Sequence, residues 1–215
     1  MEDKMIRVAI THGDTNGIGY EVILKTFATP TILELCTPIV YGSPKLAAYH
    51  RKALNLETSF NIIERAEDAC DGKLNILACF DDEVKVDLGQ PSEEAGKAAL
   101  MALDRAMTDY RSGLYDVLVT APINKATIQG EGFHFPGHTE YIETCVGEGN
   151  KALMILMNED LRVALVTTHL PIRNVAEAIT QEAIVEKASI FNLSLKRDFR
   201  ISSPRIAVLS LNPHA

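Results

Sequence analysis

Two histidines, His169 and His214, each follow an apolar run of strand length and are the best candidates for metal ligands in this sequence. The runs are VALVTT at 163–168 and AVLSLNP at 207–213. In α/β sheets, ligands bind at the carboxyl ends of strands, and a neutral imidazole is a common ligand for divalent transition metals. A catalytic zinc normally takes three protein ligands. The pair therefore indicates part of a metal site or, as the alternative, two hydrogen-bonded loop residues.

A second candidate site lies in the segment FPGHTEY at 135–141, where a chain break precedes a predicted helix. Thr139 is expected to cap this helix, with Glu140 in its first turn. A helix amino terminus flanked by His138 and a hydroxyl group is suited to bind a phosphate, because free N–H groups and two side-chain donors converge there. The alternative is an ordinary capped helix with a surface histidine.

The glycine-rich segment Gly13–Gly19 follows a predicted strand and opens a predicted helix. Its spacing fits neither the GxGxxG dinucleotide fingerprint nor a P-loop. Such a turn offers backbone N–H groups to an anion, but it is equally expected where glycine dihedrals are needed for a tight strand-to-helix connection. Both readings stay open.

Alternation of strand-length and helix-length segments predicts an α/β fold with a largely parallel sheet covered on both faces. The predicted strands of the first half are 5–11, 38–41, 74–79 and 116–120, and the predicted helices are 21–27, 43–54 and 92–111. Ser43 and Ser92 stand where helix N-caps are expected.

The pattern changes after residue 135, which predicts a first α/β lobe over 1–135 and a partial second lobe over 136–215. Segments 152–157 and 162–167 are separated by three polar residues, which favours an antiparallel hairpin. A long helix over 180–196 and a buried strand over 205–211 are expected to follow.

The formal net charge of −8 argues against nucleic acid or an anionic membrane as a partner. The four cysteines form no CxxC pair, which favours free thiols in a reducing cytoplasm. We find no signal-peptide core and no apolar stretch that approaches the length of a membrane span. These features predict a soluble cytoplasmic protein.

Five motifs occur in order: GDTNGIGYE (13–21), APINK (121–125), FPGHTE (135–140), LRVALVTTHLPI (161–172) and LNPHA (211–215). Together they closely resemble the 4-hydroxythreonine-4-phosphate dehydrogenase family of vitamin B6 biosynthesis. Each motif alone is weak, but five in this order are specific.

The resemblance implies a homodimer of two-lobed α/β/α chains with a mixed sheet, similar to isocitrate and isopropylmalate dehydrogenases. It implies NAD as cofactor and a divalent metal (Zn, Mg or Co) held by His169 and His214. His138 and Thr139 would contact the phosphate of the substrate, whereas Lys125 receives no role. The implied reaction is the oxidation and decarboxylation of 4-phosphooxy-L-threonine, or of a related phosphorylated 3-hydroxy acid, for pyridoxal phosphate biosynthesis.

Two departures from the family pattern qualify this reading. Thr15 and Tyr20 replace the prolines usual in the first motif, which leaves open a different four-carbon phosphorylated hydroxy acid as substrate. The family also continues past NPHA and carries a third metal-binding histidine there. We therefore expect a C-terminal part to be missing and this chain alone to be inactive. The alternatives are a non-catalytic metal- or phosphate-binding fragment, and a metal-dependent lyase or hydrolase.

Overall fold

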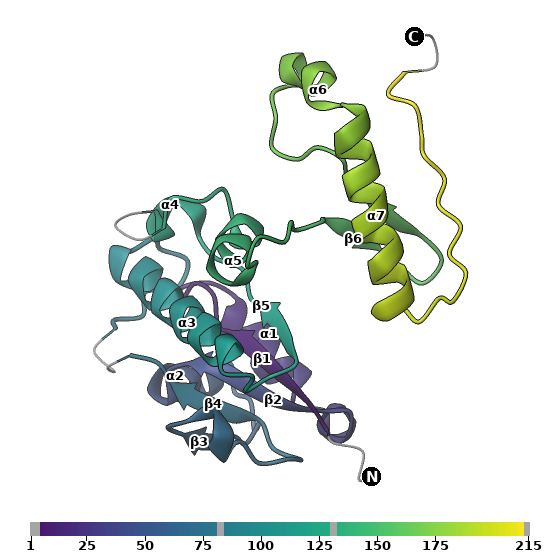
Figure 1. The fold of residues 1–215 in the computed structure, drawn as a ribbon. Helices are drawn as coiled ribbons and strands as arrows, with labels where there is room; N and C mark the ends of the chain where they lie inside the picture. The colour runs from purple at the N-terminus through teal and green to yellow at the C-terminus, as the bar shows by residue number, and fades with distance from the viewer. Residues whose placement is uncertain (1–4, 81–83, 130–132, 213–215) are drawn as a thin grey trace. The chain divides into compact units, whose positions relative to one another are not determined.

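Five parallel strands form a sheet in the order β3-β4-β2-β1-β5 (Figure 1). The strands are β1 (Ile6–Thr11), β2 (Cys36–Gly42), β3 (Asn61–Ile63), β4 (Asn75–Ala78) and β5 (Val117–Thr120). The computed structural model describes residues 5–80, 84–129 and 133–212, and the sheet belongs to the first of two compact units, Met1–Glu148 and Gly149–Ala215. The parallel α/β sheet predicted from the alternating pattern is confirmed.

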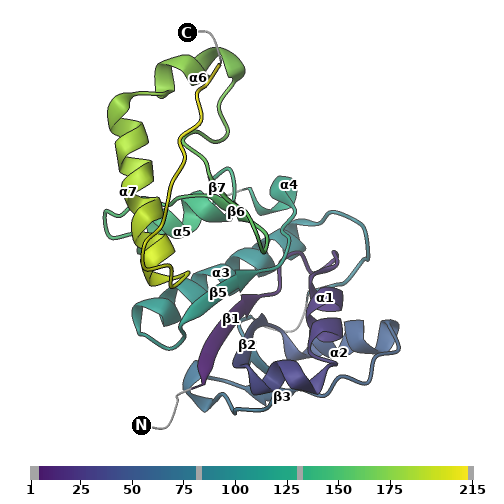
Figure 2. The same ribbon diagram turned by 90° about the vertical axis from the view of Figure 1, so that its right-hand side faces the viewer.

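Helices cover both faces of this sheet, as the apolar residues on both sides of its strands require. On one face lie α1 (Gly19–Thr26) and α2 (Pro44–Ala53), which pack on Ile10, Val40 and Ile76. On the other face lies α3 (Glu93–Arg111), which packs on Ala9, Ile39 and Leu77 (Figures 1 and 2). The alternation of neighbouring strand residues between the two clusters follows from the two-residue period of a strand.

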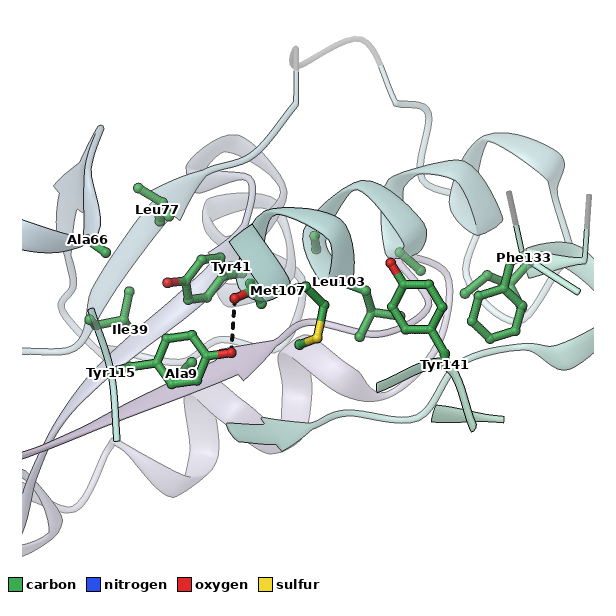
Figure 3. Packing of buried hydrophobic residues seen from close by; sticks show 14 of the residues in the cluster. Ala9, Ile39, Tyr41, Ala66, Leu77, Leu103, Met107, Tyr115, Phe133 and Tyr141 are labelled. Atoms are coloured by element: carbon green, nitrogen blue, oxygen red, sulfur yellow. Dashed lines mark hydrogen bonds between the residues drawn. The ribbon is translucent and has the colours of Figure 1, made fainter. Parts of the chain in front are cut away.

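The remaining elements of the first unit are short. They are the 3₁₀ turns η1 (Pro30–Glu34) and η2 (Ala66–Asp68), and the helices α4 (Lys125–Ile128) and α5 (His138–Val146). Both helices pack against α3. Figure 3 shows Tyr141 of α5 and Phe133 packed near one end of α3. Tyr41 of β2 and Tyr115 pack against the other end of this helix.

Local capping explains where several helices begin. The side chains of Ser43, Ser92 and Thr180 accept hydrogen bonds from backbone N–H groups three residues later, at the starts of α2, α3 and α7 (Gln181–Arg197). The caps predicted at Ser43 and Ser92 are confirmed, and Pro44 occupies the first turn of α2, where a missing N–H is harmless.

The second unit contains the hairpin β6 (Ile155–Met157) and β7 (Arg162–Ala164), followed by α6 (Ile172–Ala178) and α7 (Gln181–Arg197). The two strands pair antiparallel, which confirms the predicted hairpin. The lobe boundary predicted near residue 135 stays a prediction, although Tyr141, which lies beyond it, is buried in the core of the first unit.

The predicted strand over 205–211 is wrong for the described residues. This segment has no regular secondary structure, and Leu209 exposes 89% of its surface. A strand needs a neighbour that takes its backbone hydrogen bonds, and the described part of the chain supplies none for this segment. Its apolar composition alone was therefore a poor guide.

The predicted Thr139 cap is also wrong. Gly137 is the N-cap residue of α5, it has an extended backbone, and no side chain caps the helix there. Helical dihedrals begin at His138, directly after the break at Pro136 and Gly137, so Thr139 lies inside the first turn. None of the helices in the described ranges is long and apolar enough to cross a membrane.

Candidate functional site

The loops that follow β1 and β5 lie side by side at the carboxyl edge of the sheet. The Asp14 N–H donates to the Pro122 carbonyl oxygen at 2.9 Å. Gly13 has φ +76°, and a Cβ there would lie 2.3 Å from the same oxygen, so only glycine fits. In the sheet, β1 lies between β2 and β5. The connection from β1 to β2 leads to one side of β1 and the connection from β4 to β5 leads to the other, so the strand order reverses here. Ligands of open α/β sheets bind at such a position.

Several polar groups of the Gly13–Gly19 turn form hydrogen bonds with other groups of the protein. The Asn16 side chain donates to the Gln90 carbonyl oxygen at 2.8 Å and to Ser92 Oγ at 3.2 Å, and it accepts from the Asp87 N–H at 2.9 Å. The Gly17 N–H donates to the Asp14 carbonyl oxygen at 3.1 Å. These bonds favour the reading of the turn as a rigid strand-to-helix connection.

Three aromatic rings stack beneath the turn, an arrangement that the sequence analysis missed. Tyr20 lies between His12 and His50, with ring centroids 5.1 Å from each. Its hydroxyl accepts from the Ser43 N–H at 2.9 Å, and His50 Nε2–H donates to the Thr15 carbonyl oxygen at 2.9 Å. The Tyr20 that replaces the usual proline therefore ties the turn to the start of α2. No local sequence signal could predict this contact.

Burial keeps His12 neutral. The ring is fully buried, and this desolvation lowers the pKa of His12 from 6.5 to about 4, opposed by the nearby Ala98 carbonyl and reinforced by His50. Neither ring nitrogen has a hydrogen-bond partner among the described residues. The buried hydroxyls of Thr11 and Thr15 likewise have none there. Such unpaired buried groups are rare and are expected to bind ordered water.

Lys125 and His138 stand on different helices of the first unit, and the charge of Lys125 acts on the His138 imidazole. Asn124 caps α4 by accepting from the Ala126 N–H at 3.0 Å, which places the exposed Lys125 in the first turn. The pKa of His138 is lowered first by burial and second by the positive charge of Lys125. His138 Nε2 is buried and has no partner among the described residues.

This arrangement is suited to bind an anion. The N–H groups of the first turn of α5 have no side-chain cap, and His138 in that turn lies within electrostatic reach of the Lys125 ammonium group. A helix amino terminus and a lysine are both favourable for a phosphate. The adjacency of Lys125, for which the sequence analysis found no role, depends on α4 and α5 packing on the same helix.

Of the two predicted metal ligands, the structure describes His169. His169 lies in an exposed loop between β7 and α6, with φ +56°, five residues past the end of its strand. His214 lies outside the described residues. Within residues 5–80, 84–129 and 133–212, no group of three or more His, Cys, Asp or Glu side chains is arranged to hold a metal. The assignment of His169 and His214 as metal ligands stays a prediction.

Comparison with known proteins identifies the family. The profile described as "Pyridoxal phosphate biosynthetic protein PdxA" matches residues 34–215. A curated 4-hydroxythreonine-4-phosphate dehydrogenase from Bacteroides thetaiotaomicron is 64% identical over the whole chain, which covers 59% of that relative. The enzyme of the same name from Sulfurihydrogenibium sp. is 36% identical over 98% of this chain and 64% of its own length.

Solved structures agree with the sequence comparison. A crystal structure of a 4-hydroxythreonine-4-phosphate dehydrogenase from Burkholderia phymatum has a TM-score of 0.82 at 31% identity, over 99% of this chain and 64% of that one. The corresponding structure from Klebsiella pneumoniae has a TM-score of 0.79 at 25% identity, over 95% of this chain and 62% of that one. The chain thus spans about three fifths of the length of these relatives. On the profile match, which covers most of its residues, the chain belongs to the PdxA family of pyridoxal phosphate biosynthetic proteins.

Proposed function

We propose that the protein is an NAD- and divalent-metal-dependent dehydrogenase that oxidises 4-phosphooxy-L-threonine, with loss of CO2, in the cytoplasm. The names of the relatives support the dehydrogenase activity, and the family description supports a place in pyridoxal phosphate biosynthesis. We also propose a homodimer of two-lobed chains with the architecture of isocitrate and isopropylmalate dehydrogenases. This chain would contribute one lobe and part of the second.

The observation that carries the proposal is the anion site at the start of α5. Lys125, His138 and Thr139 would bind the substrate phosphate, which is carried by the carbon next to the one that is oxidised and is itself unchanged in the reaction. Because the pKa of His138 is lowered, its imidazole is neutral at pH 7 and can donate one N–H to a phosphate oxygen. Lys125 would supply the positive charge that a dianionic phosphate needs. Holding the phosphate in this way positions the hydroxyl-bearing carbon through remote binding energy.

Oxidation requires the substrate hydroxyl to lose its proton and its carbon to lose a hydride. His169 and His214 are the residues proposed to hold the metal, although only His169 is described and it alone is not a binding site. When bound, the metal would lower the pKa of the hydroxyl and the nicotinamide would accept the hydride. The β-keto acid formed would then lose CO2.

The two substitutions in the first motif, Thr15 and Tyr20, do not by themselves favour another substrate. Tyr20 and Thr15 are buried, and Tyr20 packs between two histidine rings. A different four-carbon phosphorylated hydroxy acid therefore remains the alternative substrate without a structural observation in its favour. A non-catalytic phosphate-binding fragment remains the alternative for this chain alone.

Calorimetry with inorganic phosphate tests the anion site in the 215-residue chain. Lys125→Met and His138→Gln should each weaken phosphate binding by about tenfold, the effect of losing one charge-assisted hydrogen bond. Lys52→Met is the matched control, because Lys52 is exposed on α2, which covers the opposite face of the sheet. Unchanged binding in both site variants would refute the phosphate assignment.

The reaction itself is tested by NADH formation with 4-phosphooxy-L-threonine and a divalent metal, in a chain of the relatives' full length. Turnover that depends on both His169 and His214 is the expected result. The 215-residue chain should show almost no turnover, since two ligands stand where a catalytic metal site normally needs three. Full turnover by this chain would contradict that expectation.

A further inference from the structure

The amino terminus of α5 is placed by contacts in the body of the helix rather than by a cap. Gly137, its N-cap residue, offers no side chain, and the first turn contains the proposed phosphate-binding residues His138 and Thr139. Since no cap holds this end, the position of the first turn depends on what holds the following turns. Tyr141 is the only residue of α5 that is buried, among those described.

Tyr141 makes two kinds of contact. Its ring packs against Phe133 and Phe135, with centroid distances of 5.2 and 5.5 Å (Figure 3 shows it beside Phe133). Its hydroxyl donates a hydrogen bond to the carboxylate of Asp104 on α3. At the other end of α5, the guanidinium of Arg111, also on α3, donates to the Cys145 carbonyl oxygen at 2.5 Å. Both polar contacts join α5 to the same helix.

The apolar and polar contacts of Tyr141 restrict the position of α5 to different degrees. A phenylalanine at this position would keep the ring packing, and ring packing tolerates small rotations and slides of a helix. A hydrogen bond to a carboxylate is directional and fixes one register of α5 on α3. His138 and Tyr141 are three residues apart and therefore lie on the same face of the helix, so a shift at one is transmitted to the other.

We propose that the Tyr141–Asp104 hydrogen bond is a positioning device that holds His138 and Thr139 in place for an anion. The proposal rests on the phosphate-binding function assigned above to these two residues. Tyr141 and Asp104 are positioning residues here and do not touch the substrate.

The hydrogen bond is available throughout the working pH range. The pKa of the Tyr141 phenol is raised, first by burial and second by the hydrogen bond to Asp104, so the hydroxyl stays protonated and remains a donor.

The test uses His138 itself as the reporter. In the 215-residue chain, the imidazole pKa of His138 is followed by NMR, with the signal assigned by its loss in His138→Gln. Burial and Lys125 hold this pKa below the ordinary value, so displacement of the first turn should move it upward. We expect this upward shift in Tyr141→Phe and Asp104→Ala, and not in Asp104→Asn, whose amide oxygen still accepts the hydrogen bond.

The matched control is Tyr115→Phe. Tyr115 is also buried, and it donates to the Ala106 carbonyl oxygen of α3 at 2.9 Å (Figure 3), while its ring packs against Tyr41 and Tyr110. This variant should lose stability without changing the pKa of His138. If Tyr141→Phe likewise lowers the melting temperature but leaves that pKa unchanged, the pair is merely structural and the proposal is overturned.

Phosphate calorimetry separates this proposal from the function on which it rests. Tyr141→Phe and Asp104→Ala should each weaken phosphate binding by up to about fivefold, the effect of one hydrogen bond, whereas Asp104→Asn should keep most of the binding. If His138→Gln does not weaken binding, the phosphate assignment fails, yet the pKa shift in Tyr141→Phe would still establish the positioning. If the pKa does not shift but His138→Gln abolishes binding, only the positioning fails.

Discussion

Gly96 is the point where α3 touches the backbone of α4, and Gly96→Ala is the sharpest test of how Lys125 is placed. A Cβ at Gly96 would lie 2.0 Å from the Thr127 carbonyl oxygen and 2.4 Å from the Thr127 carbonyl carbon. An ordinary contact is about 3.4 Å, so α4 would have to retreat by about 1.4 Å. The obstacle is backbone, which cannot rotate aside as a flexible side chain does.

Two effects of opposite sign determine the result. Replacing glycine by alanine inside a helix stabilises it by at most about 1 kcal/mol, because the unfolded chain has less freedom to lose. Overpacking against a rigid neighbour costs about 1–3 kcal/mol, and a clash this close belongs at the upper end. The expected net effect is a loss of about 2 kcal/mol of unfolding free energy, together with weaker phosphate binding, because α4 carries Lys125.

Urea unfolding measures the first effect and phosphate calorimetry the second. The control compares Lys97→Ala with Lys97→Gly, since Lys97 is the next residue of α3 and is exposed. The difference in unfolding free energy between these two variants measures the helix propensity of alanine relative to glycine where no clash occurs. If Gly96→Ala proves as stable as the parent protein, or gains the full propensity term, then α4 does not pack on Gly96 as described.

Three further predictions follow from buried groups. The pKa of His12 in the folded state is about 4, below its ordinary 6.5, so the unfolded state takes up the proton more readily. The free energy of unfolding should therefore fall by about 3 kcal/mol as the pH drops from 6.5 to 4. Urea unfolding of His12→Phe should show a flatter dependence of this free energy on pH. Tyr41→Phe should cost about 1.5–3 kcal/mol, measured by urea unfolding, because the Tyr41 hydroxyl donates to the buried Asp109 carboxylate at 2.9 Å; a smaller cost than that of Tyr115→Phe would contradict this. Gly13→Ala should cost about 2 kcal/mol or more, because a side chain there meets both a positive φ and the Pro122 carbonyl; a stable variant in thermal melts would show that this loop contact is not rigid.

Much of the fold could be predicted because its signals are local. Ser43 and Ser92 cap their helices through N–H groups three residues away, and the central strands are rich in apolar side chains that pack on both faces of the sheet. The hairpin of β6 and β7 follows from two apolar runs separated by a short polar turn. Each of these features is encoded within a few residues, so a single sequence is sufficient to find them.

The failures share one physical cause. The apolar segment 205–211 reads as a buried strand, but whether it forms one depends on a neighbouring strand to take its backbone hydrogen bonds. The start of α5 was misplaced at Thr139 because the register of this helix is held by Asp104 and the aromatic side chains around Tyr141, not by a cap. In both cases the deciding partner is remote in the sequence.

The candidate site divides in the same way. The sequence by itself predicts which residues carry the chemistry, since the ordered motifs single out His138, Thr139, His169 and His214 without any coordinates, and this assignment stays a prediction. Only the tertiary structure decided that Lys125 lies within electrostatic reach of His138 and that Tyr20 packs between two histidines. The sequence gives the type of each residue directly. The burial and the neighbouring charges that shift the pKa of a side chain arise only when distant segments pack together.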